Sequence, residues 1–360
     1  MLAFLKDTTR TAGKRGKNAD STRVVAAPLA QRVARPHPLR DRVLPPPHDS
    51  DVKTTAVTPA DLAASVFAVP PLARHSDLSL NRDANRSMIR YLEDGGVSSL
   101  LYGGNANLYN VSVREFPELL DLLEGEAGAD TWMIPSVGPD FGKMLDQAAV
   151  LAGRDFPTVM ILPLVFPSTD AGLATGIRHF AERYGKPVVM YIKSDNYIEP
   201  ATVGALAADG LVSAVKYGTV RKDPSVDPYL RALLDAVDPA LVVSGIGERP
   251  AIIHLRDFGL SAFTSGSVCV APRSSMRLLH LLTERRYDEA AEVRAAFIPL
   301  EDCRDAFSPI RTLHDAVTLA GIADMGPMYP TLSNLGAAQQ AEVRAAAVAL
   351  KAFDAQVVTA

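Results

Sequence analysis

The stretch PVVMYIKSDNYIEPATVGALAADGLVSAVKYG, residues 187–218, decides the fold. It opens and closes on short apolar runs rich in β-branched residues, PVVMYIK (187–193) and VSAVKYG (212–218). Runs of this length next to Gly and Pro are typical of buried strands. The second run starts at residue 212 and the first at residue 187, which is the spacing of one βα unit. The stretch therefore predicts two parallel strands joined by a helical crossover.

The same alternation extends on both sides of this stretch. Eight apolar runs recur with starts 22 to 33 residues apart, namely SVFAVPP (65–71), VSSLLYGG (97–104), DTWMIPSV (130–137), TVMILPLVF (158–166), PVVMYIK (187–193), VSAVKYG (212–218), ALVVSGIGE (240–248) and AFTSGSV (262–268). Helical patterns lie between them; TDAGLATGIRHFAERYG (169–185) opens on a Thr-Asp cap and closes on Gly185. Eight strand–helix units predict a (β/α)₈ TIM barrel, which leaves no sheet edge. A doubly wound open sheet is the alternative, weakened because no GxGxxG follows the first run.

Both ends of the chain depart from this pattern. Helical patterns without a convincing strand follow residue 287, over YDEAAEVRAAFIPLEDCRDAF (287–307), SPIRTLHDAVTLAGIA (308–323) and GAAQQAEVRAAAVALKAFDAQ (336–356). Residues 1–60 lack the apolar segment of about 7 to 15 residues that a secretory signal needs. We therefore expect a basic, disordered leader over 1–60, with a transit peptide as the alternative, the barrel over 61–286 and a C-terminal helical extension over 287–360.

The composition excludes several classes of function. The 360 residues are 48% hydrophobic and 22% charged, as in soluble globular proteins. Residues 1–53 hold 11 Lys/Arg against 5 Asp, which leaves 26 Lys/Arg against 36 Asp/Glu, so the body does not favour nucleic acid. The longest apolar run, 158–166, is too short to cross a membrane. Cys269 and Cys303 form neither a disulfide framework nor a metal motif, so we expect a cytoplasmic protein.

The active site of such a barrel lies at the C-terminal ends of the strands. In VSAVKYG, alternation places Val212, Ala214 and Lys216 on one face, so Lys216 is expected to point into the barrel. Burial lowers the pKa of an amine toward the range in which it attacks a carbonyl, which is Schiff-base chemistry. A lysine that reaches solvent at the rim is the alternative.

Other strand ends offer further candidates. In PVVMYIK, Tyr191 shares a face with Lys193, and a phenol relays protons during imine formation; an aromatic core filler is the alternative. Glycines in YGGNANLYN (102–110) suit the approach of a carboxylate to backbone N–H groups, although a plain tight turn fits equally well. Small residues in SGIG (244–247) and TSGSV (264–268) leave room at the mouth. The expected substrate-binding residues are Gly104, Asn105, Lys193, Asn196, Gly245 and Ser265.

Taken in order, these features resemble the dihydrodipicolinate synthase and N-acetylneuraminate lyase family over roughly residues 63–355. The resemblance is carried by the glycine pair before LYNVSVREF (108–116), and by VMY (189–191), VSAVKYG, VSG (243–245) and SGSVCVAP (265–272). It implies that Lys216 forms the Schiff base and that Tyr191 relays protons. It also implies a homodimer or homotetramer and no metal or organic cofactor.

The sequence departs from the family pattern at several polar positions. Gly104 and Asn105 stand where the family has the threonine pair of a GTTGE-like segment. Leu164 and Val165 stand where the synthase branch has tyrosines, and Asn196 stands where it has a carboxylate-binding arginine. The run YIKSDNYIE is more similar to the 5-keto-4-deoxyglucarate dehydratase branch. The lysine chemistry therefore carries over, and the synthase reaction does not.

Residues and resemblance together predict a lyase, either an aldolase or a dehydratase, that acts on a 2-oxo acid such as pyruvate or a keto sugar acid. Because Asn196 cannot imitate the two-pronged grip of arginine, dihydrodipicolinate synthesis is not expected. Lys193 is expected to supply part of the anchoring and to lower the pKa of Lys216, with an outward, solvated lysine as the alternative. A non-catalytic 2-oxo acid sensor on the same barrel is the second hypothesis.

Overall fold

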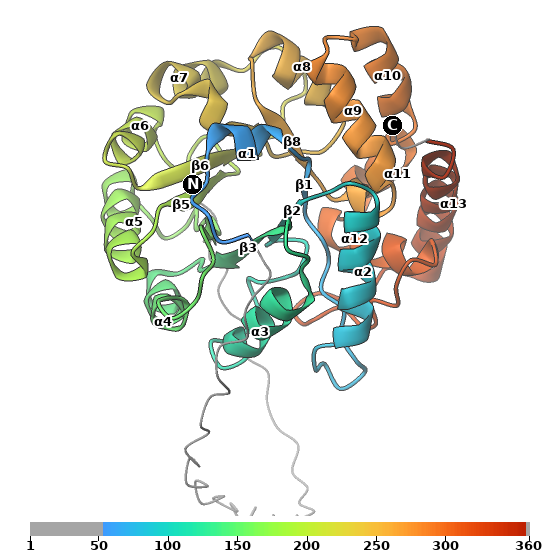
Figure 1. Ribbon diagram of the computed structural model, residues 1–360, viewed down its shortest axis with the longest axis horizontal. Coiled ribbons are helices and arrows are strands. Elements are labelled where there is room, and N and C mark those ends of the chain that lie inside the picture. The colour runs from blue at the N-terminus through green and yellow to red at the C-terminus, as the bar shows by residue number, and fades with distance from the viewer. Residues whose placement is uncertain (1–52, 358–360) are drawn as a thin grey trace, which may run out of the picture. The chain divides into compact units, whose positions relative to one another are not determined.

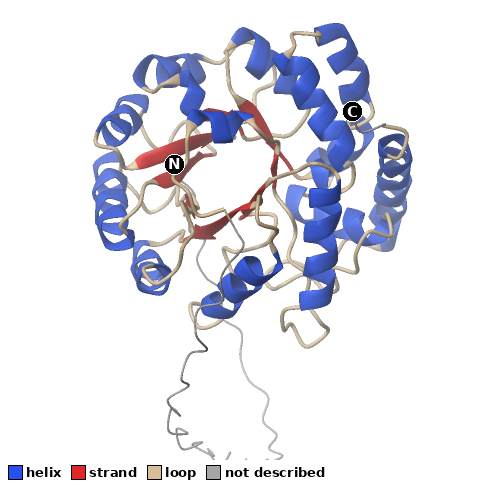
Figure 2. Ribbon diagram, in the orientation of Figure 1, coloured by secondary structure: helices blue, strands red, loops and turns tan. Residues whose placement is uncertain are grey.

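The computed structural model describes residues 53–357, which form a closed barrel of eight parallel strands surrounded by helices (Figure 1; Figure 2). The strands follow chain order: β1 (Phe67–Ala68), β2 (Ser99–Tyr102), β3 (Trp132–Val137), β4 (Met160–Ile161), β5 (Val188–Ile192), β6 (Val212–Tyr217), β7 (Val242–Ser244) and β8 (Ala262–Ser265). The predicted (β/α)₈ barrel is confirmed, and the open sheet is wrong. β1 and β4 have two residues each, because Pro70 and Pro163 lack the N–H groups that would extend their ladders.

Helices cover the outside of the barrel (Figure 2). The helices between successive strands are α2 (Arg82–Asp94), α3 (Phe116–Glu126), α4 (Phe141–Leu151), α5 (Asp170–Tyr184), α6 (Pro200–Ala208), α7 (Pro228–Ala236) and α8 (Ala251–Asp257). Short 3-10 helices, η1 (Pro239–Leu241) and η2 (Ser267–Cys269), precede β7 and follow β8. The predicted extension is confirmed as helical: after α9 (Pro272–Thr283) come α10 (Tyr287–Ala295), α11 (Ile298–Ala306), α12 (Pro309–Leu319) and α13 (Ala337–Asp354). Within residues 53–357, none of the helices is long and apolar enough to span a membrane.

The pairing of β5 with β6 brings two predicted site residues together. Tyr191 lies opposite Lys216 in the parallel ladder. Lower in the ladder the register shifts, because Val188 pairs with Val212 and the next pair skips Ser213. This extra residue is a β-bulge, and it places Val212 outside the row that contains Lys216. The alternation expected for β6 is therefore wrong at Val212 and holds above the bulge.

The described part of the chain begins before the expected boundary at residue 60. α1 (Pro59–Ala63) starts ahead of that boundary, and Thr58 caps it. The backbone N–H of Lys53 donates to the carbonyl of Thr131, 3.3 Å away and just before β3. Residues from Lys53 onward therefore lie against the N-terminal end of the barrel. The rest of the leader, residues 1–52, lies outside the described residues.

Two truncations should behave differently. Removal of residues 1–52 is expected to leave the melting temperature unchanged, because their composition offers little apolar surface to offset ordering entropy. Removal of residues 1–60 also deletes the Thr58 cap, which shares a capping box with Asp61, and Val57, which packs on the core. Loss of a cap costs about 1 kcal/mol, so we expect a drop of about 2–4 °C by calorimetry. Equal melting temperatures for the two truncations would contradict this role for the segment before α1.

Candidate active site

Lys216, near the C-terminal end of β6, is buried inside the barrel. Only 4% of the residue is exposed, and its Nζ lies 4.5 Å from the centre of the Tyr191 ring. It forms no ion pair with an acidic side chain of the described chain. Burial, with a smaller effect from the charge of Lys193, lowers the pKa of Lys216 to about 7. Much of this lysine is therefore a free amine at neutral pH, which is the nucleophilic form.

Tyr191 faces this amine from β5. Its ring lies against Gly218, where a Cβ would come within 2.8 Å of Tyr191 Cε2, so the glycine makes room for the ring. Burial raises the pKa of Tyr191; the charge of Tyr109 adds to this effect, and the charge of Arg304 opposes it. The phenol therefore stays protonated at neutral pH and can donate a proton to a departing hydroxyl.

Tyr109 and Tyr197 are two further tyrosines of this region that sequence reasoning missed. Burial, and then the charge of Tyr109, raises the pKa values of both Tyr191 and Tyr197, so the three phenols lie within electrostatic range of one another. The Tyr109 ring also neighbours Gly104, where a Cβ would lie 3.7 Å from Tyr109 Cε2. The available signal was the position of Tyr109 in a loop directly after a strand end.

Gly104, Asn105 and Gly245 lie at or just after strand ends, as predicted. Asn105 and Gly245, however, make contacts that stabilise the barrel itself. The side-chain amide of Asn105 donates to the backbone carbonyl of Val69 at 3.0 Å, which ties the loop after β2 to β1. The N–H of Gly245 donates to the carbonyl of Tyr217 at 2.5 Å, and a Cβ on Gly245 would lie 2.7 Å from the same oxygen. Close packing of β6 and β7 therefore requires Gly245. Gly104 is half-buried and has space around its Cα.

Ser265 lies on the face of β8 that points away from Lys216. Lys216 pairs with Val243 of β7, and Val243 pairs with Ala262 of β8. Because side chains alternate along a strand, the face that continues from Ala262 excludes Ser265. Its hydroxyl accepts the backbone N–H of Val268 at 2.9 Å. The substrate-binding role predicted for Ser265 has no support from this position.

Lys193 and Asn196 both lie in the loop after β5, and both are exposed. The charge of Lys193 helps to lower the pKa of Lys216, in the predicted direction. Asn196 makes a local contact, from its backbone N–H to Ser194 Oγ at 3.4 Å. The structure therefore brings Lys193 within electrostatic range of Lys216 and shows no such link for Asn196 among residues 53–357.

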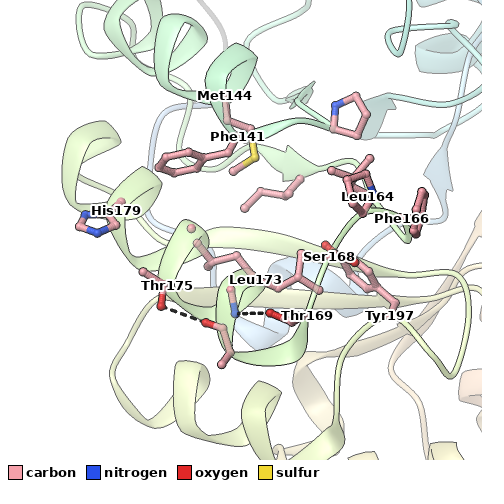
Figure 3. A pocket seen from close by; sticks show the side chains of 17 residues that line it. Phe141, Met144, Leu164, Phe166, Ser168, Thr169, Leu173, Thr175, His179 and Tyr197 are labelled. Atoms are coloured by element: carbon pink, nitrogen blue, oxygen red, sulfur yellow. Dashed lines mark hydrogen bonds between the residues drawn. The ribbon is translucent and has the colours of Figure 1, made fainter.

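An apolar groove of about 920 Å³ lies outside the barrel, between α4, α5 and the loop after β4 (Figure 3). Its rim includes Phe166, which is 86% exposed. Ile161 also lines the groove, and its ladder partner Met190 alternates with Tyr191 along β5. Ile161 therefore belongs to the outward face of β4, while Tyr197, whose phenol lies within electrostatic range of Tyr109, also lines the groove.

Comparisons with known proteins add a fold-level finding. No protein-family model and no curated protein matches the chain. Among solved structures, it is similar to dihydrodipicolinate synthase from Oceanobacillus iheyensis, with a TM-score of 0.70, 19% identity and coverage of 82% of this chain and 98% of that chain. It is also similar to a catalytic lysine mutant of Ruminococcus gnavus sialic acid aldolase (TM-score 0.72, 12% identity, coverage 83% and 99%).

A third similar structure is a prophage protein of the dihydrodipicolinic acid synthase family from E. coli K12, in complex with pyruvate (TM-score 0.69, 17% identity, coverage 79% and 98%). The chain has the fold of these proteins. Because each match covers nearly all of the other chain and about four fifths of this one, the shared fold extends beyond the barrel into the C-terminal helices.

Proposed function

We propose that the protein is a divergent member of the dihydrodipicolinate synthase and N-acetylneuraminate lyase family, and that it is a Schiff-base-forming lyase acting on a 2-oxo acid. The observation that carries this proposal is the buried Lys216 amine, whose pKa is about 7 and which faces the protonated phenol of Tyr191. The shared fold supports it, since the similar structures include an aldolase with a catalytic lysine and a protein bound to pyruvate.

The proposed chemistry uses the two side chains in sequence. The free amine of Lys216 attacks the C2 carbonyl to give a carbinolamine, and Tyr191 protonates the hydroxyl that leaves as water. The resulting iminium withdraws electrons from C3. In an aldolase the C4 hydroxyl loses its proton, the C3–C4 bond breaks with its electron pair moving toward the iminium, and an aldehyde leaves. The enamine that remains takes up a proton at C3 and becomes the imine again. In a dehydratase a C3 proton and the C4 hydroxyl leave as water. Hydrolysis of the imine returns the 2-oxo acid and free Lys216.

We propose the substrate class from the chemistry that Lys216 requires. A keto sugar acid or pyruvate supplies the C2 carbonyl that Lys216 needs, and we propose that the exposed Lys193 anchors part of the substrate. We do not propose dihydrodipicolinate synthesis, because Asn196 offers no guanidinium fork for a second carboxylate. From the sequence resemblance we also propose a cytoplasmic homodimer or homotetramer that uses no metal or organic cofactor.

A 2-oxo acid sensor is the second candidate function, favoured by the loss of hydroxyl groups at Gly104 and Asn105. Incubation of the protein with a panel of keto sugar acids distinguishes a lyase from a sensor. A lyase releases pyruvate or a dehydrated 2-oxo acid from at least one panel member, whereas a sensor binds without turnover. The protein should condense pyruvate with aspartate semialdehyde at a negligible rate. Efficient condensation would show that it catalyses the dihydrodipicolinate synthase reaction.

Lys193→Met is expected to raise the pKa of Lys216, because removal of a positive charge favours the ammonium form. Imine formation with pyruvate at neutral pH should fall by roughly twofold to fivefold and recover in alkaline solution. The measurement is borohydride trapping across pH, together with the KM of the true substrate. Lys222→Met, which removes an exposed lysine after β6, is the matched control. If the pH profile of trapping is unchanged in Lys193→Met, Lys193 does not act electrostatically on Lys216. If the KM is unchanged, Lys193 does not anchor the substrate.

A further inference from the structure

The helical extension contacts the C-terminal end of β7 through α11. Glu301 Oε1 accepts the backbone N–H of Glu248 at 3.0 Å. Arg304 Nη1 donates to the backbone carbonyl of Ile246 at 2.7 Å. Two side chains of one helix therefore hold both ends of the three-residue segment 246–248, although 53 and 58 positions separate the partners in the sequence.

Gly247, the middle residue of this segment, shows how closely α11 fits it. Its φ is +104°, which side chains rarely tolerate. A Cβ at this position would lie 2.4 Å from Glu301 Oε1 and 2.7 Å from Arg304 Nη1. The segment and the helix therefore determine each other's position, and any side chain at residue 247 would displace one of them.

The same segment continues directly into the wall of the lysine site. Gly245, which precedes it, donates its N–H to the carbonyl of Tyr217, the residue after Lys216. In addition, the positive charge of Arg304 acts on Tyr191, where it opposes the rise in pKa that burial causes. The backbone contact thus joins Gly245, next to the segment, to the neighbour of Lys216, and the electrostatic effect joins Arg304 of α11 to Tyr191.

Glu248, the last residue of this segment, is fully buried. Its Oε1 accepts the hydroxyl of Ser275 at 2.5 Å, and it also faces the hydroxyl of Ser265 and the buried thiol of Cys269. Within residues 53–357 its Oε2 has no hydrogen-bond partner. Burial raises the pKa of Glu248, against the opposing charge of Arg304.

Glu301 is fully buried as well, and it faces charges of both signs. Burial raises the pKa of Glu301 to about 8; the charges of Glu248 and Asp305 add to this, while Arg304 and Arg249 oppose it. Its Oε2 also lacks a hydrogen-bond partner in the described chain. Burial therefore favours the protonated form of both carboxyl groups at neutral pH.

We propose that Glu301 and Arg304 are positioning residues, which hold segment 246–248 and thereby the end of β7 beside Lys216. This inference rests on the proposed lyase function for its effect on catalysis. The physical reason is that Arg304 Nη1 also donates to Glu301 Oε1 at 3.3 Å, so the two side chains hold each other while each binds one end of the segment. Glu301 cannot move without releasing the Glu248 N–H.

The test compares two substitutions that separate hydrogen bonding from charge. Glu301→Gln keeps an oxygen that accepts the Glu248 N–H and cannot ionise, whereas Glu301→Leu removes the acceptor. Asp302→Asn is the control, since Asp302 is a carboxylate on the same helix whose side chain is 64% exposed. The readouts are the rate of borohydride trapping of pyruvate on Lys216 between about pH 6 and about pH 9, and hydrogen exchange of the Glu248 amide.

We expect Glu301→Leu to slow trapping by about tenfold or more at every pH and to expose the Glu248 amide to exchange. Glu301→Gln should trap pyruvate at close to the wild-type rate and keep the Glu248 amide protected, because its side-chain oxygen still accepts the Glu248 N–H. Asp302→Asn should follow the wild type throughout. If Glu301→Leu does not fold, Gly247→Ala displaces the same segment and should give the same loss.

Several outcomes would overturn the proposal. Wild-type trapping rates and amide protection in Glu301→Leu, or in Gly247→Ala if the former does not fold, would show that α11 does not position the segment. Losses of trapping and amide protection in Glu301→Gln that equal those in Glu301→Leu would show that the acceptor at residue 301 does not hold the segment. Failure of the wild type to trap any 2-oxo acid would refute the lyase function instead, and amide exchange would still decide the positioning role.

Stability gives a second signature of the buried pair. The folded-state pKa of Glu301 lies above its unfolded value, so the unfolded chain loses this proton first as pH rises. The wild type should therefore lose stability relative to Glu301→Gln between the ordinary carboxyl pKa of about 4.5 and about 8, and no further above that. Thermal unfolding of the two proteins across this range measures the difference. A constant difference would contradict the raised pKa.

Discussion

Lys216→Ala is expected to abolish reductive trapping of pyruvate. With borohydride and pyruvate, the wild type should gain the mass of the reduced adduct on the peptide that bears Lys216, and the variant should gain none. Burial lowers the pKa of this lysine to about 7, whereas lysines in water stay almost wholly protonated at neutral pH and do not attack carbonyls. Mass mapping of the digested protein is the measurement.

Two controls sharpen this experiment. Lys222→Ala, at an exposed position after β6, should trap pyruvate like the wild type. Trapping by the wild type should also fall about tenfold for each pH unit below about 7, because protonation removes the free amine. An adduct on a different lysine, with Lys216 unmodified, would overturn the assignment of the nucleophile.

Tyr191→Phe is expected to lower kcat by about 10²–10⁴ with whichever panel substrate the wild type turns over. The variant keeps the ring that fills the space between Lys216 and Gly218, so its melting temperature should change little. Trapping of pyruvate should be slower and still occur on Lys216. Tyr109→Phe is the informative comparison, and a larger loss of kcat in that variant would assign the proton relay to Tyr109 instead of Tyr191.

The barrel could be predicted because each strand–helix unit leaves a local pattern. The runs 130–137 and 187–193 correspond to β3 and β5 within two residues at each end. Strand length was less predictable where proline interrupts the ladder. The seven-residue run 65–71 contains only Phe67 and Ala68 as strand, since the two prolines that end it cannot donate to a neighbour.

The sequence alone predicts only those site residues whose orientation follows from the alternation of side chains along a single strand. Alternation along β6 and β5 was sufficient to select Lys216 and Tyr191 for the inside of the barrel. The orientation of Ser265 depends on the register between strands, and a single sequence does not display that register. Glu301 and Arg304 lie on a helix far along the chain, and no local pattern records that they contact the end of β7.

Because of the bulge in β6, the loss of one residue and the gain of one residue have different consequences for the strand. Because Ser213 is the surplus residue between the Val212 pair and the Lys216 pair, its deletion would leave a regular ladder in which Tyr191 still faces Lys216. The loss would be the 2.7 Å contact between Ser213 Oγ and Thr158 Oγ1. One added residue has no such remedy, since it would turn the amine toward the outer helices. We therefore expect loss of Ser213 to preserve the chemistry of this strand, and a residue added between Ala214 and Lys216 to abolish it.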